Sequence, residues 1–82
     1  MKDEKMIETE EKAYSAIAKL YMDKSKAVHV VLKNGSFYNG YITELNSDFF
    51  LMNERLLGET PVFFIQISKL EPYFKEGVVD GK

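Results

Sequence analysis

The sequence predicts a mainly β fold, a small five-stranded antiparallel barrel preceded by an N-terminal α-helix. The first observation is that the hydrophobic pattern changes from a helical period to alternation near Lys26. The second is that short β-branched and aromatic runs follow, separated by turn residues. The third is Gly40, in the middle of the longest run, where a glycine favours a bend. Because so short a meander cannot bury itself as a flat sheet, we expect it to curl into a barrel.

Residues 3–22 have the pattern of an amphipathic helix. Its apolar residues recur at steps of three and four and form one stripe, made of Ala13, Tyr14, Ile17, Leu20 and Tyr21. Glutamates crowd the preceding turns, so we expect a firm second half over residues 11–22 and a first half that frays. We expect the stripe to pack on the chain's own barrel; a helix that binds a partner is the alternative.

Two strands joined by a tight hairpin should follow the helix. Residues 27–32 alternate and are rich in β-branched side chains, as in a strand. Asn34-Gly35 then lies between two apolar runs, which is the strongest short signal of a β-hairpin. The second strand, residues 36–45, is long, and Gly40 in it should mark a sharp bend or a close backbone approach.

Three shorter strands complete the predicted barrel. A turn at residues 46–48 leads into a third strand over residues 49–52. Gly58-Glu59 should lie in a short polar loop, followed by a fourth strand over residues 61–67, which is apolar on both faces. Residues 69–72 form a last short strand, which a proline ends.

The whole chain is long enough for one domain with one modest core. We divide it into an N-terminal helix packed on the barrel (residues 1–25), the barrel itself (residues 26–74) and a disordered tail (residues 75–82). The formal net charge is −2 at pH 7, and both parts share it: residues 1–25 hold five basic and six acidic residues, and residues 26–82 hold six and seven. This composition argues against broad electrostatic RNA binding but permits a few local contacts.

The residue types predict no enzymatic active site, no metal site and no cofactor. The chain has no cysteine, which excludes disulfides, thiolate catalysis and cysteine-based zinc sites. Its one histidine, His29, lies on a predicted strand, where we expect a surface or interface side chain. The serines lack a neighbouring base or a glycine elbow, and the glycines lie at turns and bends rather than in a phosphate-binding loop.

The segment from Leu32 to Asn46 resembles the first motif of the Sm, Lsm and Hfq family. That motif has a leucine before a lysine–Asn/Asp–glycine turn, an aromatic residue three positions after the glycine, and a second glycine two positions further. The matching residues here are Leu32, Asn34, Gly35, Tyr38 and Gly40. With the preceding helix and the strand order, the resemblance covers about residues 11–73. Barrels of the SH3 type, which share the curl, are the structural alternative.

The resemblance implies a homo-oligomeric ring, a hexamer or heptamer, that binds single-stranded RNA around its pore. Ring formation also has independent physical support, because an open barrel leaves two sheet edges that are prone to pair with another chain. If the fourth strand of one copy pairs with the fifth of the next, the contact is head-to-tail and can close into a ring. The alternative is a monomer with a central fourth strand. The residues expected at the oligomer interface are Val62, Phe63, Phe64, Ile65, Ile67 and Leu70.

The family's uridine pocket is degenerate in this chain. By position, its turn residues fall on Asn46, Asp48 and Phe50, of which Asp48 cannot stack on a base and Phe50 cannot make the hydrogen bonds that distinguish uracil. Residues 63–66 carry no cation, where Sm proteins have arginine–glycine and Hfq has lysine–histidine.

A rebuilt RNA site would need other groups. Phe49 and Phe50 offer ring faces for stacking, and Gln66 could hydrogen-bond a base edge. The alternative is that these phenylalanines belong to the core or to an interface. The candidate RNA-binding residues are therefore Asn46, Asp48, Phe49, Phe50 and Gln66, with Lys33, Arg55 or Lys69 near phosphates.

The absence of a long apolar run or a signal peptide predicts a cytoplasmic protein that does not enter a membrane. Two functions remain open. The first is an Sm-like ring that binds single-stranded RNA, and the second is an Sm-like scaffold that binds protein, or only itself.

Overall fold

The N-terminal helix leads directly into the sheet. The computed structural model describes residues 2–73, with side-chain surroundings from Glu10 onward, and its helix α1 spans Lys2–Asp23. This agrees with the helix predicted over residues 3–22, while the fraying expected of its first half stays a prediction. The predicted tail, residues 75–82, lies outside the described residues.

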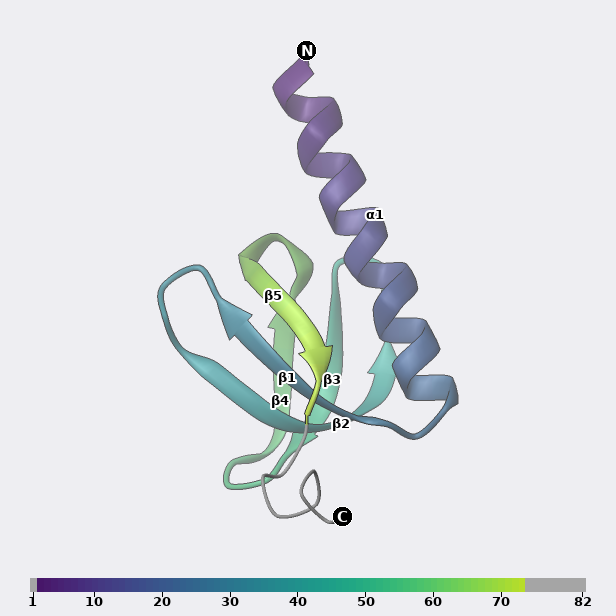
Figure 1. Ribbon diagram of the computed structural model, residues 1–82, viewed down its shortest axis with the longest axis vertical. Helices are drawn as coiled ribbons and strands as arrows, with labels where there is room; N and C mark the ends of the chain where they lie inside the picture. Colours follow the sequence, from purple (N-terminus) through teal and green to yellow (C-terminus); the bar gives the residue numbers. More distant parts are fainter. Residues whose placement is uncertain (1, 74–82) are drawn as a thin grey trace, which may run out of the picture.

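Five antiparallel strands form one curled sheet after the helix (Figure 1). Their bounds are β1 Ala27–Leu32, β2 Phe37–Leu45, β3 Phe49–Glu54, β4 Gly58–Phe63 and β5 Ile67–Pro72. The order across the sheet is β4-β3-β2-β1-β5, so the chain's last two strands lie at opposite edges. The predicted fold class, a mainly β five-stranded antiparallel architecture with an N-terminal helix, is confirmed.

The predicted bounds of the fourth strand, residues 61–67, are wrong at both ends. β4 begins at Gly58, so Gly58-Glu59 belongs to the strand and the loop before it is residues 55–57. The strand ends at Phe63, where a short 3-10 turn, η1 (Phe64–Gln66), turns the chain into β5. An apolar run gives no sign of such a turn, because the turn buries Phe64 as a strand would.

The β1–β2 turn and the bend in β2 use their residues as the sequence predicts. Gly35 has a φ of +94°, which favours glycine, and the Asn34 side-chain oxygen accepts a 2.9 Å hydrogen bond from the Ser36 N–H. At Gly40 the backbone of β3 passes so close that a Cβ would lie 2.1 Å from the Asn53 carbonyl oxygen. Gly40 is therefore the close backbone approach that its position in the strand predicts.

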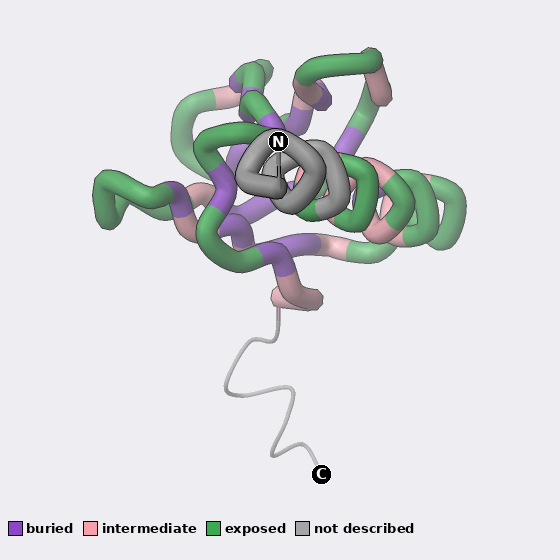
Figure 2. The backbone as a smooth tube through the Cα atoms, turned by 90° about the horizontal axis from the view of Figure 1, so that it is seen from above, coloured by how far each residue is buried: buried purple, intermediate pink, exposed green. Residues whose placement is uncertain are grey.

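One apolar core lies inside the curl and under the helix (Figure 2). Its largest fully buried side chains are Phe50, Phe64, Met52, Ile67, Val28, Val30 and Val62. The helix contributes Ala18, which is fully buried, and packs Tyr14 and Ile17 against the core. The Tyr14 hydroxyl also donates a 3.0 Å hydrogen bond to the Ser68 carbonyl in β5, so the second half of the helix rests on the chain's own sheet.

Candidate subunit interface and nucleic-acid site

The free edge of β4 presents the backbone groups of alternate residues. The Phe64 N–H donates to the Asp48 carbonyl at 3.0 Å, which makes Phe63 and Phe49 a non-hydrogen-bonded pair of the β3–β4 ladder. Backbone groups in such a pair point away from each other, and the pattern repeats every second residue. Glu59, Pro61 and Phe63 therefore turn their backbone groups toward the open edge.

The free edge of β5 follows from the same reasoning. The Tyr73 N–H donates to the Ala27 carbonyl at 3.0 Å, so Pro72 and Val28 form a non-hydrogen-bonded pair. Two residues earlier, Leu70 lies opposite Val30 in the same way. The backbone groups of Leu70 and Pro72 therefore point away from β1, toward solvent.

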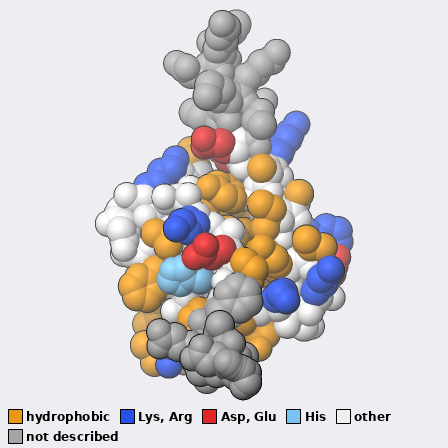
Figure 3. All heavy atoms as spheres, viewed as in Figure 1, with side chains coloured by type: hydrophobic (Ala, Val, Ile, Leu, Met, Phe, Trp, Pro, Cys, Tyr) orange, Lys and Arg blue, Asp and Glu red, His pale blue; other side chains and the backbone are white. Residues whose placement is uncertain are grey.

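The residues that face the two open edges point their side chains to opposite sides of the sheet. On β4, the residues that face the edge carry their side chains on the outside of the curl: Phe63 is 43% exposed, with its ring centroid 5.1 Å from that of Phe49. On β5, the edge-facing Leu70 carries its side chain into the core. Hydrophobic side chains also gather along the seam between α1 and β5 (Figure 3). Each open edge therefore carries apolar side chains, on the outer face of the curl at β4 and on its inner face at β5.

The predicted interface residues divide into two groups. Phe63 and Ile65 are accessible, at 43% and 55% exposure. The other four side chains are packed into their own chain's core, because β4 alternates its faces and the 3-10 turn points inward at its first residue; these are Val62, Phe64, Ile67 and Leu70. The prediction that their side chains form the oligomer interface is therefore corrected, while Leu70 keeps its backbone groups at an open edge.

The predicted RNA-binding residues are also divided by the fold. Phe50 is fully buried and its ring packs against that of Phe64, so it cannot stack on a base, and that prediction is wrong. Phe49 is half-buried beside the Phe63 ring. Asp48 is exposed, and the Asn46 side chain donates a 3.1 Å hydrogen bond to Glu44 while its backbone N–H closes the β2–β3 turn on the Phe49 carbonyl.

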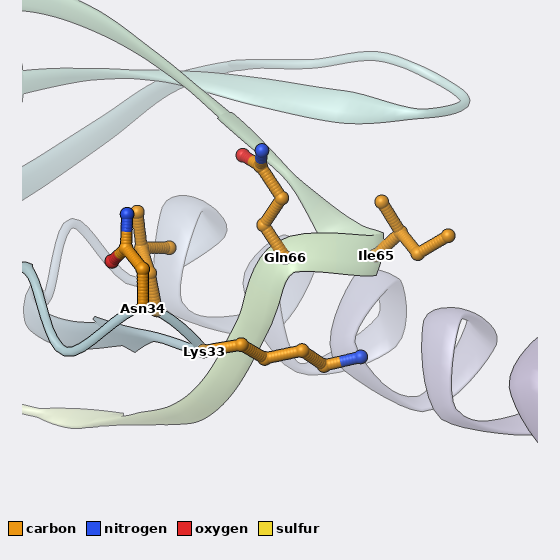
Figure 4. A pocket seen from close by; sticks show the side chains of 5 residues that line it. Lys33, Asn34, Ile65 and Gln66 are labelled. Carbon is orange, nitrogen blue, oxygen red and sulfur yellow. The ribbon is translucent and has the colours of Figure 1, made fainter.

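Gln66 lies beside the β1–β2 turn, which the sequence could not predict. The Lys33 N–H donates a 2.8 Å hydrogen bond to the Gln66 carbonyl, and this bond ties the hairpin turn to the 3-10 turn. The two turns line a hollow of about 190 Å³, together with Leu32, Asn34 and Ile65. Figure 4 shows the Asn34 and Gln66 amides rising on the same side of this hollow, while Lys33 extends along the 3-10 turn toward Ile65.

The groups around this hollow are hydrogen-bonding amides and one cation. Two side-chain amides donate and accept hydrogen bonds, and the Lys33 ammonium can contact a phosphate. Asn34 was predicted only as a turn residue; its oxygen keeps that role, while its NH₂ group faces the hollow as a donor. The Asn34-Gly35 turn is therefore the feature of the sequence that marks the position of this hollow.

Glu54 is a buried carboxylate that the sequence analysis missed. It accepts backbone hydrogen bonds from Asn39 at 3.0 Å, from Leu56 at 2.8 Å and from Leu57 at 3.0 Å. These bonds, first that of Asn39, lower the pKa of Glu54 below its ordinary value. Because all three partners are backbone groups of the β2 strand and the β3–β4 turn, the role of Glu54 is structural.

His29 is held in an aromatic cluster on the outer face of the sheet. Its Nδ1 hydrogen-bonds to the Asn39 side-chain oxygen, and its ring lies 5.5 Å from Phe37 and 6.5 Å from Tyr73. Among residues 10–73, no group of three potential metal ligands forms around it or elsewhere. In the helix that the structure describes, no stretch is long and apolar enough to cross a membrane.

Comparison with known proteins identifies the type of fold. No family model matches the sequence. No curated protein matches it either. Among solved structures, one that it resembles is a crystal structure of Hfq, described as a pleiotropic translational regulator, with a TM-score of 0.64 and 17% sequence identity. The match covers 72% of this chain and 97% of the Hfq chain. Together with the helix, the strand order and the glycine bend, it shows that this chain has the Sm-like fold of Hfq.

Proposed function

We propose that this protein assembles into a homo-oligomeric ring that binds single-stranded RNA. The observation that carries the proposal is the complementarity of the two open edges. On β4 the outward-facing Pro61 and Phe63 have apolar side chains outside the curl, and on β5 the outward-facing Leu70 has its side chain inside it. Paired residues of a β-ladder share a face, so joining the edges would lay the outer face of β4 against the neighbour's core.

Such a junction would cover the apolar groups that the single chain leaves open. Phe63 of one copy would lie over the seam between α1 and β5 of the next, where Tyr14 packs against the core and its hydroxyl donates to the Ser68 carbonyl. Uncovered edges with apolar side chains invite uncontrolled pairing, and natural proteins avoid such exposure. Since β4 and β5 are different surfaces, the contact is head-to-tail and closes into a ring when the rotation allows. The resemblance to the Sm-like family favours six or seven copies.

The RNA part of the proposal rests on the Lys33–Gln66 hollow. A ring would repeat its lysine and two amides around one axis, so that a short strand could meet several copies in succession. The ring face of Phe49 lies partly open as well and could stack on a base, which would contribute about 1–3 kcal/mol. Exposed Asp48 and the net charge of −2 oppose binding, so we expect modest affinity and weak base preference. The proposed role is binding rather than catalysis.

Native mass spectrometry of the full chain, with and without short oligonucleotides, tests both parts together. We expect a six- or seven-copy species at micromolar concentration, and a further mass increase with uridine- or adenine-rich RNA at low salt. A monomer throughout would contradict the ring. A ring that takes up no oligonucleotide would contradict RNA binding and would leave the scaffold function in its place.

A further inference from the structure

The open edge of β4 has a gap in its hydrogen-bonding groups. Its three outward residues offer carbonyls at Glu59, Pro61 and Phe63, but N–H donors only at Glu59 and Phe63. Pro61 lies at the centre of this edge, opposite Leu51 on β3. Because the backbone nitrogen at this position faces outward, its missing N–H removes no hydrogen bond from the chain's own sheet.

The open edge of β5 is also poor in donors. Leu70 offers both an N–H and a carbonyl, whereas Pro72 offers only a carbonyl. The N–H of Ile67, at the start of the strand, is already used by the Phe64 carbonyl of the 3-10 turn. A second copy that joins these edges therefore meets few donors, and the positions of the prolines decide which registers are possible.

Three antiparallel registers set Leu70 opposite an outward residue of β4. If Leu70 lies opposite Phe63, then Pro61 lies opposite Pro72, and two carbonyls face each other without a donor. If Leu70 lies opposite Glu59, the carboxylate is brought to the apolar core face of the neighbour, which is costly for a charge without a partner. In that register Pro72 would also face Leu57, whose N–H is already bound by the Glu54 carboxylate.

The third register sets Pro61 opposite Leu70 and avoids both conflicts. The Leu70 N–H then donates to the Pro61 carbonyl, and the Glu59 N–H donates to the Pro72 carbonyl. Apolar Pro61 faces apolar Leu70, and the Glu59 carboxylate lies at the end of the junction. The Leu70 carbonyl remains without a donor, because Pro61 has none to give, and Phe63 lies opposite Ser68, whose carbonyl already accepts the Tyr14 hydroxyl.

We propose that Pro61 sets the register and limits the strength of the contact between copies, with Leu70 of the neighbouring copy as its partner. This inference rests on the proposed ring. A proline at the centre of an edge strand weakens pairing without disturbing the strand's own sheet, which is a known way to restrain edge association. The ring would therefore be held mainly by apolar side chains, and the Pro61–Leu70 and Glu59–Pro72 pairs would supply one backbone hydrogen bond each.

Replacing Pro61 by valine tests the strength of the contact. Pro61→Val supplies the missing donor for the Leu70 carbonyl, and one added hydrogen bond should tighten each junction by roughly two- to tenfold. Sedimentation velocity over a dilution series would measure the concentration at which the assembly dissociates. Glu59→Pro removes the donor to Pro72 and should weaken assembly, whereas Glu59→Val keeps the N–H and serves as its matched control.

Amide hydrogen exchange tests the register itself. In the wild-type assembly we expect the amides of Glu59 and Leu70 to become protected relative to the dilute monomer. Unchanged assembly in Pro61→Val, or an unprotected Leu70 amide in an assembled ring, would overturn the role of Pro61 while leaving the ring intact. If wild type and Pro61→Val are both monomeric at every concentration, the proposed ring itself fails. Far-ultraviolet circular dichroism of each variant checks that the monomer has folded.

Discussion

Single residues decide how tightly this sheet can curl. Gly40 and Gly35 are both glycines of the first hairpin, yet they are needed for different reasons. At Gly40 there is no room for a Cβ beside the backbone of β3, whereas at Gly35 the space is open and only the positive φ disfavours a side chain. The difference allows a matched comparison of close approach with backbone strain.

We expect Gly40→Ala to destabilise the fold far more than Gly35→Ala. The added methyl group at position 40 would meet the Asn53 carbonyl oxygen and carbon at 2.1 and 2.9 Å, and backbone atoms cannot move aside as a side-chain end can. The cost should reach about 3 kcal/mol or more, at the upper end for overpacking. Gly35→Ala should cost about 1–2 kcal/mol for the left-handed conformation. Urea unfolding of both variants measures the two costs, and equal costs would contradict the close approach.

Glu54 is the residue through which acid should act on the fold. Its folded-state pKa is lowered, so its contribution to stability is present above the ordinary carboxyl pKa of 4.5 and is lost as the pH falls through the folded value. We expect Glu54→Gln to be less stable than wild type at pH 7, since the amide is a weaker acceptor for three N–H groups. The gap between the two proteins should narrow as the pH is lowered below 4.5.

Unfolding by urea at several pH values checks this behaviour. Glu59→Gln is the matched control, because the Glu59 side chain is exposed on the neighbouring strand. If the difference between wild type and Glu54→Gln were the same at pH 7 and pH 3, the backbone hydrogen bonds of Glu54 would not be the source of its stabilisation.

At the scale of elements, the end of α1 positions the helix over the sheet. The Ser25 N–H donates to the Met22 carbonyl at 3.0 Å and the Lys26 N–H to the Tyr21 carbonyl at 2.9 Å, which is the pattern of a Schellman motif. Ser25 lies at the left-handed position of that motif with a φ of +52°. Most proteins place glycine there, because a Cβ in this conformation is unfavourable.

Ser25→Gly should therefore stabilise the chain, by up to about 1 kcal/mol, through relief of this strain. Thermal unfolding would show the gain as a higher midpoint. Lys24→Gly is the matched control, because Lys24 precedes the left-handed residue and a glycine there should give no gain. A Ser25→Gly protein less stable than wild type would mean that the hydroxyl, and not the backbone, matters at this position.

At the scale of the whole molecule, the turns at one end of the curl bring together residues far apart in the sequence. Lys33 and Gln66 meet only because β1 and β5 are neighbours, although β5 is the last strand of the chain. If the hollow they line binds RNA, Lys33 is the cation among the described residues that line it and should carry the dependence on salt.

We expect Lys33→Ala to weaken oligonucleotide binding about equally for all sequences. It should also flatten the dependence of affinity on salt, by about 0.7 in the logarithmic slope for each phosphate contact removed. Fluorescence anisotropy with labelled RNA over a range of salt concentrations measures both effects. Lys19→Ala is the control, since the Lys19 ammonium is paired with Asp23 at 3.0 Å on the exposed helix. Equal losses in the two variants would exclude the hollow as the binding site.

Local features of the sequence determined much of this architecture. The helix, the first hairpin with Asn34-Gly35 and the close approach at Gly40 were predictable because each depends on residues near one another in the chain, through periodicity, turn chemistry or the lack of a side chain. The accessible side chain of Phe63 was predictable for the same reason, since strand alternation places apolar side chains on both faces, whereas Ile65 is accessible because it lies in the 3-10 turn.

Tertiary structure alone decided which of these residues could reach another molecule. Phe49 and Phe50 are alike in the sequence, but packing against Phe64 buries the second completely and leaves the first beside the open edge. The end of β4 at Phe63, the buried carboxylate of Glu54 and the meeting of Lys33 with Gln66 all depend on contacts between strands distant in the chain. Burial and hydrogen-bond register are properties of how the strands pair, and no local pattern of side chains contains them.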